Sequence, residues 1–165
     1  MRVVNWIAAA LLAALPLQGN AAGFGKAEAV PSRNVDIIPG VTITATILKR
    51  SGEVATKVSS LSVLHLRSYV TVQKGTGSQT LNLHCRATWI DANGQPGDFV
   101  KDVPVCFKAT APATSLPYDL QLDVKFRPSQ DDPPGTSGFR IEVWDEVTGA
   151  RTEFDVTYGW KGFKS

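Results

Sequence analysis

The fold class of this chain is decided by one stretch, Tyr118-Asp119-Leu120-Gln121-Leu122-Asp123-Val124-Lys125-Phe126. Apolar and polar residues alternate at every step, so the Tyr, Leu, Leu, Val and Phe side chains fall on one face. This period of two is typical of a strand with one buried face and one face in water. The stretch therefore predicts one continuous β-strand over residues 118–126.

The same period recurs on both sides of this strand, and helical periodicity is absent. Further strands are predicted at 41–47, 61–72, 81–89 and 103–108, with short extended pieces at 35–38 and 54–58. A hairpin is predicted from 139–144 and 153–160, joined by a turn at 147–150. In the 103–108 strand, alternation places Cys106 on the face opposite Val105 and Phe107.

About seven short antiparallel strands predict an all-β, two-layer β-sandwich with an immunoglobulin-like topology. A small β-barrel is the alternative fold. We expect residues 34–165 to form this single domain, and residues 22–33, rich in Gly, Ala, Pro and charge, to form a flexible arm. The residues predicted for the buried layer are Trp89, Phe107, Leu122 and Ile141.

The first 21 residues have the order of a signal peptide. Arg2 precedes an apolar run over residues 3–17, and Gly19 and Ala21 are the small residues that signal peptidase requires. The run is shorter than the ~20 residues that span a bilayer, so we expect cleavage after Ala21 and no membrane insertion afterwards. Cleavage after Ala22 and an uncleaved membrane anchor are the alternatives. The sequence thus predicts a periplasmic or extracellular protein. The residue order of the leader is of the bacterial type.

Charge excludes two classes of partner. Of 17 Lys and Arg residues, removal of Arg2 leaves 16 against 15 Asp and Glu residues, so the mature net charge is about +1. Nucleic acid or an anionic membrane would require a concentrated basic patch. A protein partner in the cell envelope is expected instead, and the sequence leaves the oligomeric state open.

Cys85 and Cys106 are the two cysteines of the chain. In an oxidising compartment two cysteines usually pair, and closing a loop of this length stabilises the fold by roughly 3 kcal/mol. A metal site or a catalytic thiol is the alternative, but the spacing is not CxxC and no His-rich segment adjoins either residue.

No motif for catalysis, metal or cofactor is complete, so the protein is not expected to be an enzyme. His65 and His84 are isolated on separate strands. The segment 91–102 fails as an EF-hand because Pro96 stands where Gly is required. The carboxylate pairs at 131–132 and 145–146 resemble glycosidase acids in number only, and we interpret them as loop residues.

The candidate binding surface consists of aromatic residues with basic neighbours, which are good anchors for a protein partner. These residues are Trp144, Tyr158, Trp160 and Phe163. The alternative is that they cap the open end of the sandwich. The preferred function is a non-catalytic exported module that binds another envelope protein through its sheet edges or this aromatic tail.

Two other functions stay open: a structural subunit or assembly factor of a bacterial surface appendage, and a small hydrolase or metal-dependent enzyme. Precursor length, leader and strand count are similar to those of bacterial fimbrial subunits. Those subunits have a Tyr next to last, whereas Lys164 stands there in this chain. No family is assigned.

Overall fold

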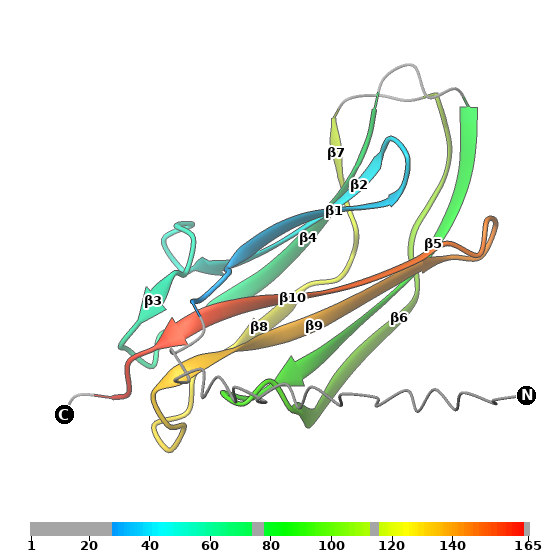
Figure 1. Cartoon of the computed structure of the whole chain (residues 1–165). Helices are drawn as coiled ribbons and strands as arrows, with labels where there is room; N and C mark the ends of the chain where they lie inside the picture. The colour runs from blue at the N-terminus through cyan, green and yellow to red at the C-terminus, as the bar shows by residue number, and fades with distance from the viewer. Residues whose placement is uncertain (1–27, 74–77, 113–115, 164–165) are drawn as a thin grey trace, which may run out of the picture.

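The computed structural model of the chain describes residues 28–73, 78–112 and 116–163 (Figure 1). The predicted signal peptide at 1–21 and residues 22–27 of the predicted arm lie outside the described residues. The described residues contain no helix long and apolar enough to cross a membrane.

Two sheets make up the described part of the chain (Figure 1). The first sheet contains β1 (Ser32–Ile38), β2 (Val41–Lys49), β4 (Leu64–Val72), β7 (Pro117–Asp119) and β8 (Val124–Phe126). The second contains β3 (Lys57–Val58), β10 (Arg151–Trp160), β9 (Gly135–Asp145), β5 (Ser78–Ile90) and β6 (Pro96–Pro112). Their order is β1-β2-β4 with β7 and β8 both on β4, and β3-β10-β9-β5-β6. All pairs are antiparallel except β3 with β10.

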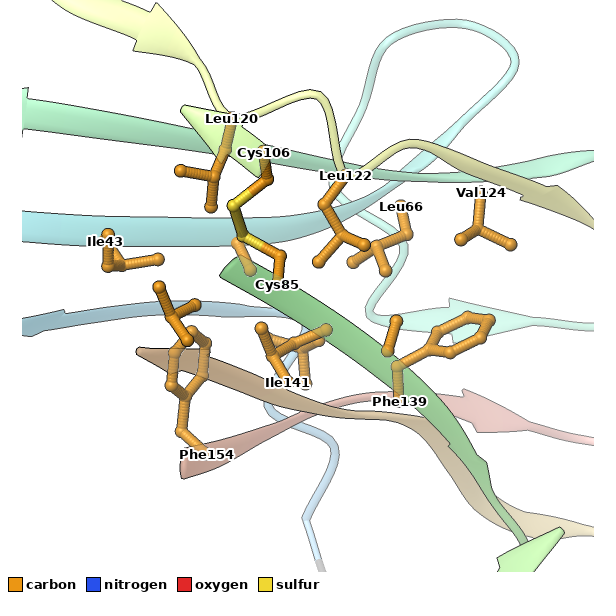
Figure 2. Packing of buried hydrophobic residues seen from close by; sticks show 14 of the residues in the cluster. Ile43, Leu66, Cys85, Cys106, Leu120, Leu122, Val124, Phe139, Ile141 and Phe154 are labelled. Carbon is orange, nitrogen blue, oxygen red and sulfur yellow. A yellow bond between two sulfur atoms is a disulfide. The ribbon is translucent and has the colours of Figure 1, made fainter. Parts of the chain in front are cut away.

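The predicted all-β class with two layers is confirmed, and the barrel alternative is wrong because the two sheets do not close on each other. Alternate residues of each central strand are buried, as in β4, where every second side chain from Leu64 to Val72 is buried. These inward side chains of both sheets form one hydrophobic cluster. Figure 2 shows part of it, with Leu120, Leu122 and Val124 of one layer facing Phe139 and Ile141 of the other.

The strand predicted over 118–126 is in fact two short strands. β7 and β8 both pair with β4, and residues 120–123 between them lie opposite only Arg67 and Ser68. The excess of two residues is taken up by a local turn in which Gln121 has a φ of 57° and Leu120 N donates to Ser68 O. An excess of two keeps the same side chains inward, so Leu120 and Leu122 remain fully buried.

Strand β6 has two irregularities of the same size. Residues 97–99 lie opposite Trp89 alone, and residues 104–106 lie opposite His84 alone. At the second irregularity Cys106 and Phe107 both become buried while Val105 stays exposed. The prediction that Cys106 faces away from Phe107 is therefore wrong, because the strand does not keep a regular pleat there.

The predicted disulfide is present between Cys85 and Cys106, with both residues fully buried and their Cα atoms 5.7 Å apart (Figure 2). It joins β5 to β6, which are neighbours in one sheet. In antibody domains the disulfide instead joins the two sheets. The bond here fastens the edge strand β6 to the centre of its own sheet.

The ordered domain begins earlier than residue 34. Val30 exchanges hydrogen bonds with Thr157 of β10, at 2.9 and 3.0 Å, and Pro31 O accepts a bond from Ile47 N. Ser32 already belongs to β1, which pairs with β2 of the other sheet. Residues 30–33 thus tie the two sheets together instead of forming a free arm.

Candidate binding site

The four aromatic residues of the predicted binding surface do not share a surface. Tyr158 is fully buried and Trp160 is 3 % exposed, because both have the same inward phase on β10 as Phe154 and Val156. Trp160 Nε1 donates to the carbonyl of Asp132, 3.0 Å away. These two rings are core residues, and the prediction that they are exposed is corrected.

Trp144 and Phe163 have accessible surface, but they lie at opposite ends of β10. Trp144 pairs with Arg151 at the start of β10, and Phe163, half-exposed, follows the end of that strand. A ten-residue strand is about 30 Å long, so no single small contact covers both residues.

Trp144 is the centre of a group that we call the outer-face cluster: His84, Arg86, Glu142, Trp144 and Arg151. The His84 ring stacks on Trp144 with centroids 5.2 Å apart, and Arg86 and Arg151 lie over the Trp ring at 5.8 and 5.5 Å. Both arginines also pair with Glu142, which is only 12 % exposed. Both arginines are thus held between the face of the Trp144 ring and the Glu142 carboxylate.

Two further carboxylates extend the outer-face cluster. Asp102 accepts a hydrogen bond from Arg86 Nε at 2.6 Å, and this contact is the main cause of the raised pKa of Arg86. Glu146 Oε1 lies 2.7 Å from His84 Nε2, although the two groups are not aligned as a good hydrogen bond. Each arginine of the cluster therefore has at least one carboxylate beside it.

A different arrangement is found where the edge strand β6 faces β8 across the two sheets. A pocket of about 320 Å³ opens there, and we call it the edge pocket. Four rings line it (Trp89, Phe99, Phe126 and Phe139), together with Val124, Lys125, Arg127, Ser129 and Asp132. Sequence analysis placed Trp89 in the buried layer and did not identify the pocket.

The rings of the edge pocket pack edge to face, the preferred arrangement for aromatic pairs. Trp89 is T-shaped to Phe126 and Phe139, with centroids 5.7 and 5.2 Å apart, and Phe99 is T-shaped to Phe139 at 6.2 Å. Phe139 is buried, whereas Phe99 is 49 % exposed and Trp89 is half-buried. The floor of the pocket is thus core and its wall is accessible.

The irregularity of β6 at residues 97–99 builds this wall. A side chain at Gly97 would place its Cβ 2.8 Å from Cδ1 of Trp89, so only glycine allows β6 to lie so close to the ring. The two extra residues leave Phe99 beside the pocket and not in a regular pleat. Further along β6, Lys101 Nζ donates to Asp123 O and bridges the edges of the two sheets.

The charges around the edge pocket are not balanced as in the outer-face cluster. Lys125 and Arg127 are exposed, and neither has an ion-pair partner among the residues that the structure describes. Asp132 is the one carboxylate among the lining residues, and it accepts a hydrogen bond from Ser129 N at 3.0 Å. The rim of the pocket carries a net positive charge.

Behind the edge pocket lies an unusual hydroxyl group. The Tyr158 ring packs against Phe126, with centroids 5.7 Å apart, and its buried hydroxyl has no hydrogen-bond partner. Burial, and then the negative charge of Asp132, raise the pKa of Tyr158 well above its usual value. The hydroxyl therefore stays protonated, and its O–H group has no acceptor among the described residues.

In the acidic pair at 145–146, Asp145 has a structural role. Asp145 is 1 % exposed and accepts hydrogen bonds from Asn82 N, from Val147 N, and from both the backbone and the hydroxyl of Thr148. Burial alone would raise the pKa of Asp145, but these donors outweigh it and hold the pKa below its ordinary value. This carboxylate closes the β9–β10 turn.

The calcium-like segment and the histidines are explained in a similar way. Asp91 accepts bonds from Asn93 N and Gln95 N at 2.8 and 2.9 Å and so closes the β5–β6 turn. His65 pairs with Asp123. Within the described ranges, no three His, Cys, Asp or Glu side chains gather as metal ligands would.

A larger hollow of about 770 Å³ lies at the end of the molecule formed by residues 28–33, 90–94 and 133–136. Its walls are turns and mixed charges such as Arg33 and Asp155, without an aromatic side chain. Ligand sites are usually apolar with a few converging polar groups. The edge pocket fits this description better in spite of its smaller volume.

Comparison with known proteins adds little. No protein-family model matches the chain, and no curated protein is similar to it. Among solved structures, a crystal structure described as an ApaA protein from Bordetella pertussis is similar, with 12 % sequence identity and a TM-score of 0.41. The likeness covers 83 % of this chain and 99 % of that one, and it is too low to support an argument about function.

Proposed function

We propose that this protein is an exported, non-catalytic module that binds another protein of the cell envelope, and that the edge pocket is its contact site. One observation carries the proposal: aromatic side chains line an open pocket beside the edge strand β6, and Phe99 in its wall is 49 % exposed. Exposed aromatic side chains at pockets are the residues that most often dominate protein–protein affinity. The preference for a protein partner follows from the near-neutral charge of the chain.

Export is part of the same proposal. A buried disulfide persists in the periplasm or outside the cell but is rare in the cytosol, so the Cys85–Cys106 bond supports an exported location. The residue order of 1–21 supports a cleaved leader. We also assign the sandwich to the immunoglobulin-like class, which is supported by the crossing of residues 30–33 from one sheet to the other.

The contact site is tested by photo-crosslinking in the native cells. A benzophenone amino acid replaces Phe99 in one strain and Val147 in another, since Val147 is equally exposed, at 55 %, but lies in the β9–β10 turn. We expect an adduct with an envelope protein from position 99 and none from position 147. Equal adducts at both positions, or none at position 99, would contradict the proposal.

The leader is tested by measuring the mass of the protein recovered from the envelope fraction. A mass that begins at Ala22 and is two hydrogens lighter than the reduced chain supports both cleavage and the disulfide. A chain that retains Arg2 refutes cleavage, and a chain recovered only from the cytosol refutes export. This result is independent of the crosslinking experiment.

A further inference from the structure

We infer that the edge pocket receives one large apolar side chain of the partner protein, and that a carboxylate next to this side chain pairs with Lys125 and Arg127. The inference deepens the proposed function and rests on it, because it specifies the chemistry of the partner at the same site.

The size of the pocket sets the first requirement. Its volume of about 320 Å³ is at the small end of ligand sites, which range over about 300–1,000 Å³. The lining rings hold each other edge to face and leave the accessible parts of Trp89 and Phe99 uncovered. One aromatic or branched aliphatic side chain fits within this volume and would cover both surfaces.

Charge sets the second requirement. Lys125 and Arg127 are two residues apart and adjoin the same pocket, and neither has a counter-ion in the described part of the chain. Asp132 offsets one of these charges, but its carboxylate already accepts the Ser129 N–H. A partner with a carboxylate beside its apolar side chain supplies the missing charge, whereas a basic partner would be repelled.

The edge of β6 excludes the other common way of binding, in which the partner adds a strand to the sheet. Pro96 and Pro104 donate no N–H group, Lys101 points across the edge to Asp123 O, and the strand has two irregularities. These are the features that protect natural sheet edges from pairing with another strand. Recognition by a side chain in the pocket is therefore favoured over strand addition.

The experiment uses a displayed library of random 12-residue peptides as the probe. It is selected on the disulfide-bonded protein purified from cells, and in parallel on the Lys125→Glu/Arg127→Glu double variant. Peptides from the wild-type selection should pair a Trp, Phe or Leu with a neighbouring Asp or Glu. Peptides selected on the double variant should carry Lys or Arg in place of the acid.

Affinities of one selected peptide then test each requirement. We expect Phe99→Ser to weaken binding more than tenfold and the double charge reversal to weaken it about tenfold. Replacing the acid of the peptide by Lys should restore binding to the double variant. The matched controls are Val147→Ser and Arg50→Glu/Lys57→Glu, which make the same chemical changes at exposed positions outside the pocket and should leave the affinity unchanged.

Three outcomes would overturn the inference: selected peptides without enrichment of acids, binding that is indifferent to Phe99, or a selection that yields no binder. None of these depends on the crosslinking result. An adduct at position 99 together with any of them leaves the contact site standing and removes only the chemistry proposed here for the partner. Loss of the adduct removes the proposed function itself.

Discussion

The outer-face cluster and the edge pocket both contain a tryptophan with two cationic side chains nearby, yet they differ in how those groups are satisfied. Around Trp144, both arginines lie over the ring and are paired with Glu142. Around Trp89, Phe99 is 49 % exposed, and Lys125 and Arg127 are exposed with no ion-pair partner among the described residues. This difference in pairing is why we propose the edge pocket, and not the outer-face cluster, as the contact site.

The largest expected effect is a difference in the free energy of unfolding between a substitution in the floor of the edge pocket and one in its wall. Phe139→Ala should lower the free energy of unfolding by about 3–5 kcal/mol, because Phe139 is buried beneath three other rings. Phe99→Ala should cost about 1 kcal/mol, because half of its surface is already in water. Urea denaturation followed by tryptophan fluorescence measures both values, and similar losses would show that Phe99 is a core residue.

The second prediction concerns the disulfide, which is bonded to the same strand, β6, that carries Phe99 in the wall of the edge pocket. A Cys85→Ala/Cys106→Ala variant should lose roughly 3 kcal/mol of stability through the freed unfolded chain. Hydrogen exchange should also increase at residues 97–105 of β6, because the bond fastens this edge strand to β5. The outer-face part of β9, paired on both sides, should exchange almost as in the wild type. Equal increases in β6 and β9 would contradict this local role.

The same two regions show which parts of the fold and of the candidate site could be predicted from the sequence. Alternation predicted the two layers and the inward phase of most strands, because burial follows a period of two. The disulfide was predicted separately, from the presence of two cysteines in a chain expected to be exported. The breaks in 118–126 and in β6 were not predictable, since each adds two residues and the strand resumes the same alternation beyond it. The edge pocket depends on one of these breaks, so no periodicity argument could place Phe99 beside Trp89.

The error at the C-terminal strand had a signal that could have prevented it. Tyr158 and Trp160 share the parity of Phe154 and Val156, so the alternation that defined the strand already placed all four inward. The aromatic and basic composition of the C-terminal segment favoured a binding role for the Tyr158 and Trp160 rings, whereas periodicity favoured their burial in the core. Periodicity was the better guide, because the hydrogen-bonded ladder of β10 with β9 fixes the direction of every side chain in it.

The third prediction tests the turn beside the outer-face cluster. Asp145→Asn should cost about 1–3 kcal/mol at neutral pH, because the amide accepts fewer bonds from the Asn82, Val147 and Thr148 donors. The folded state lowers the pKa of Asp145 below its ordinary value of 3.8, so its contribution is present above about pH 4 and is lost as the pH falls through the folded pKa.

Denaturation curves from pH 7 to pH 2 measure this contribution. The wild type should lose its advantage over the Asn variant only in the acid range, and the two curves should converge there. A difference between the two proteins that is the same at pH 7 and at pH 2 would show that the charge of Asp145 does not matter.

The smallest expected effect is the change in the free energy of unfolding when one hydroxyl group is removed from each region. The buried hydroxyl of Tyr158, behind the edge pocket, has no partner, and an unpaired buried hydroxyl costs about 1–3 kcal/mol. Tyr158→Phe should therefore raise the free energy of unfolding by about 1 kcal/mol. The Thr148 hydroxyl, beside the outer-face cluster, donates to Asp145 at 2.7 Å and accepts from Ala150 N, so Thr148→Val should lower stability by about 1–2 kcal/mol.

Opposite signs in the two variants are the expected result, because one hydroxyl is satisfied within the fold and the other is not. If Tyr158→Phe also destabilises the protein, the Tyr158 hydroxyl has a partner in solution, and the contrast between an open pocket and a self-contained cluster is weaker than the structure indicates.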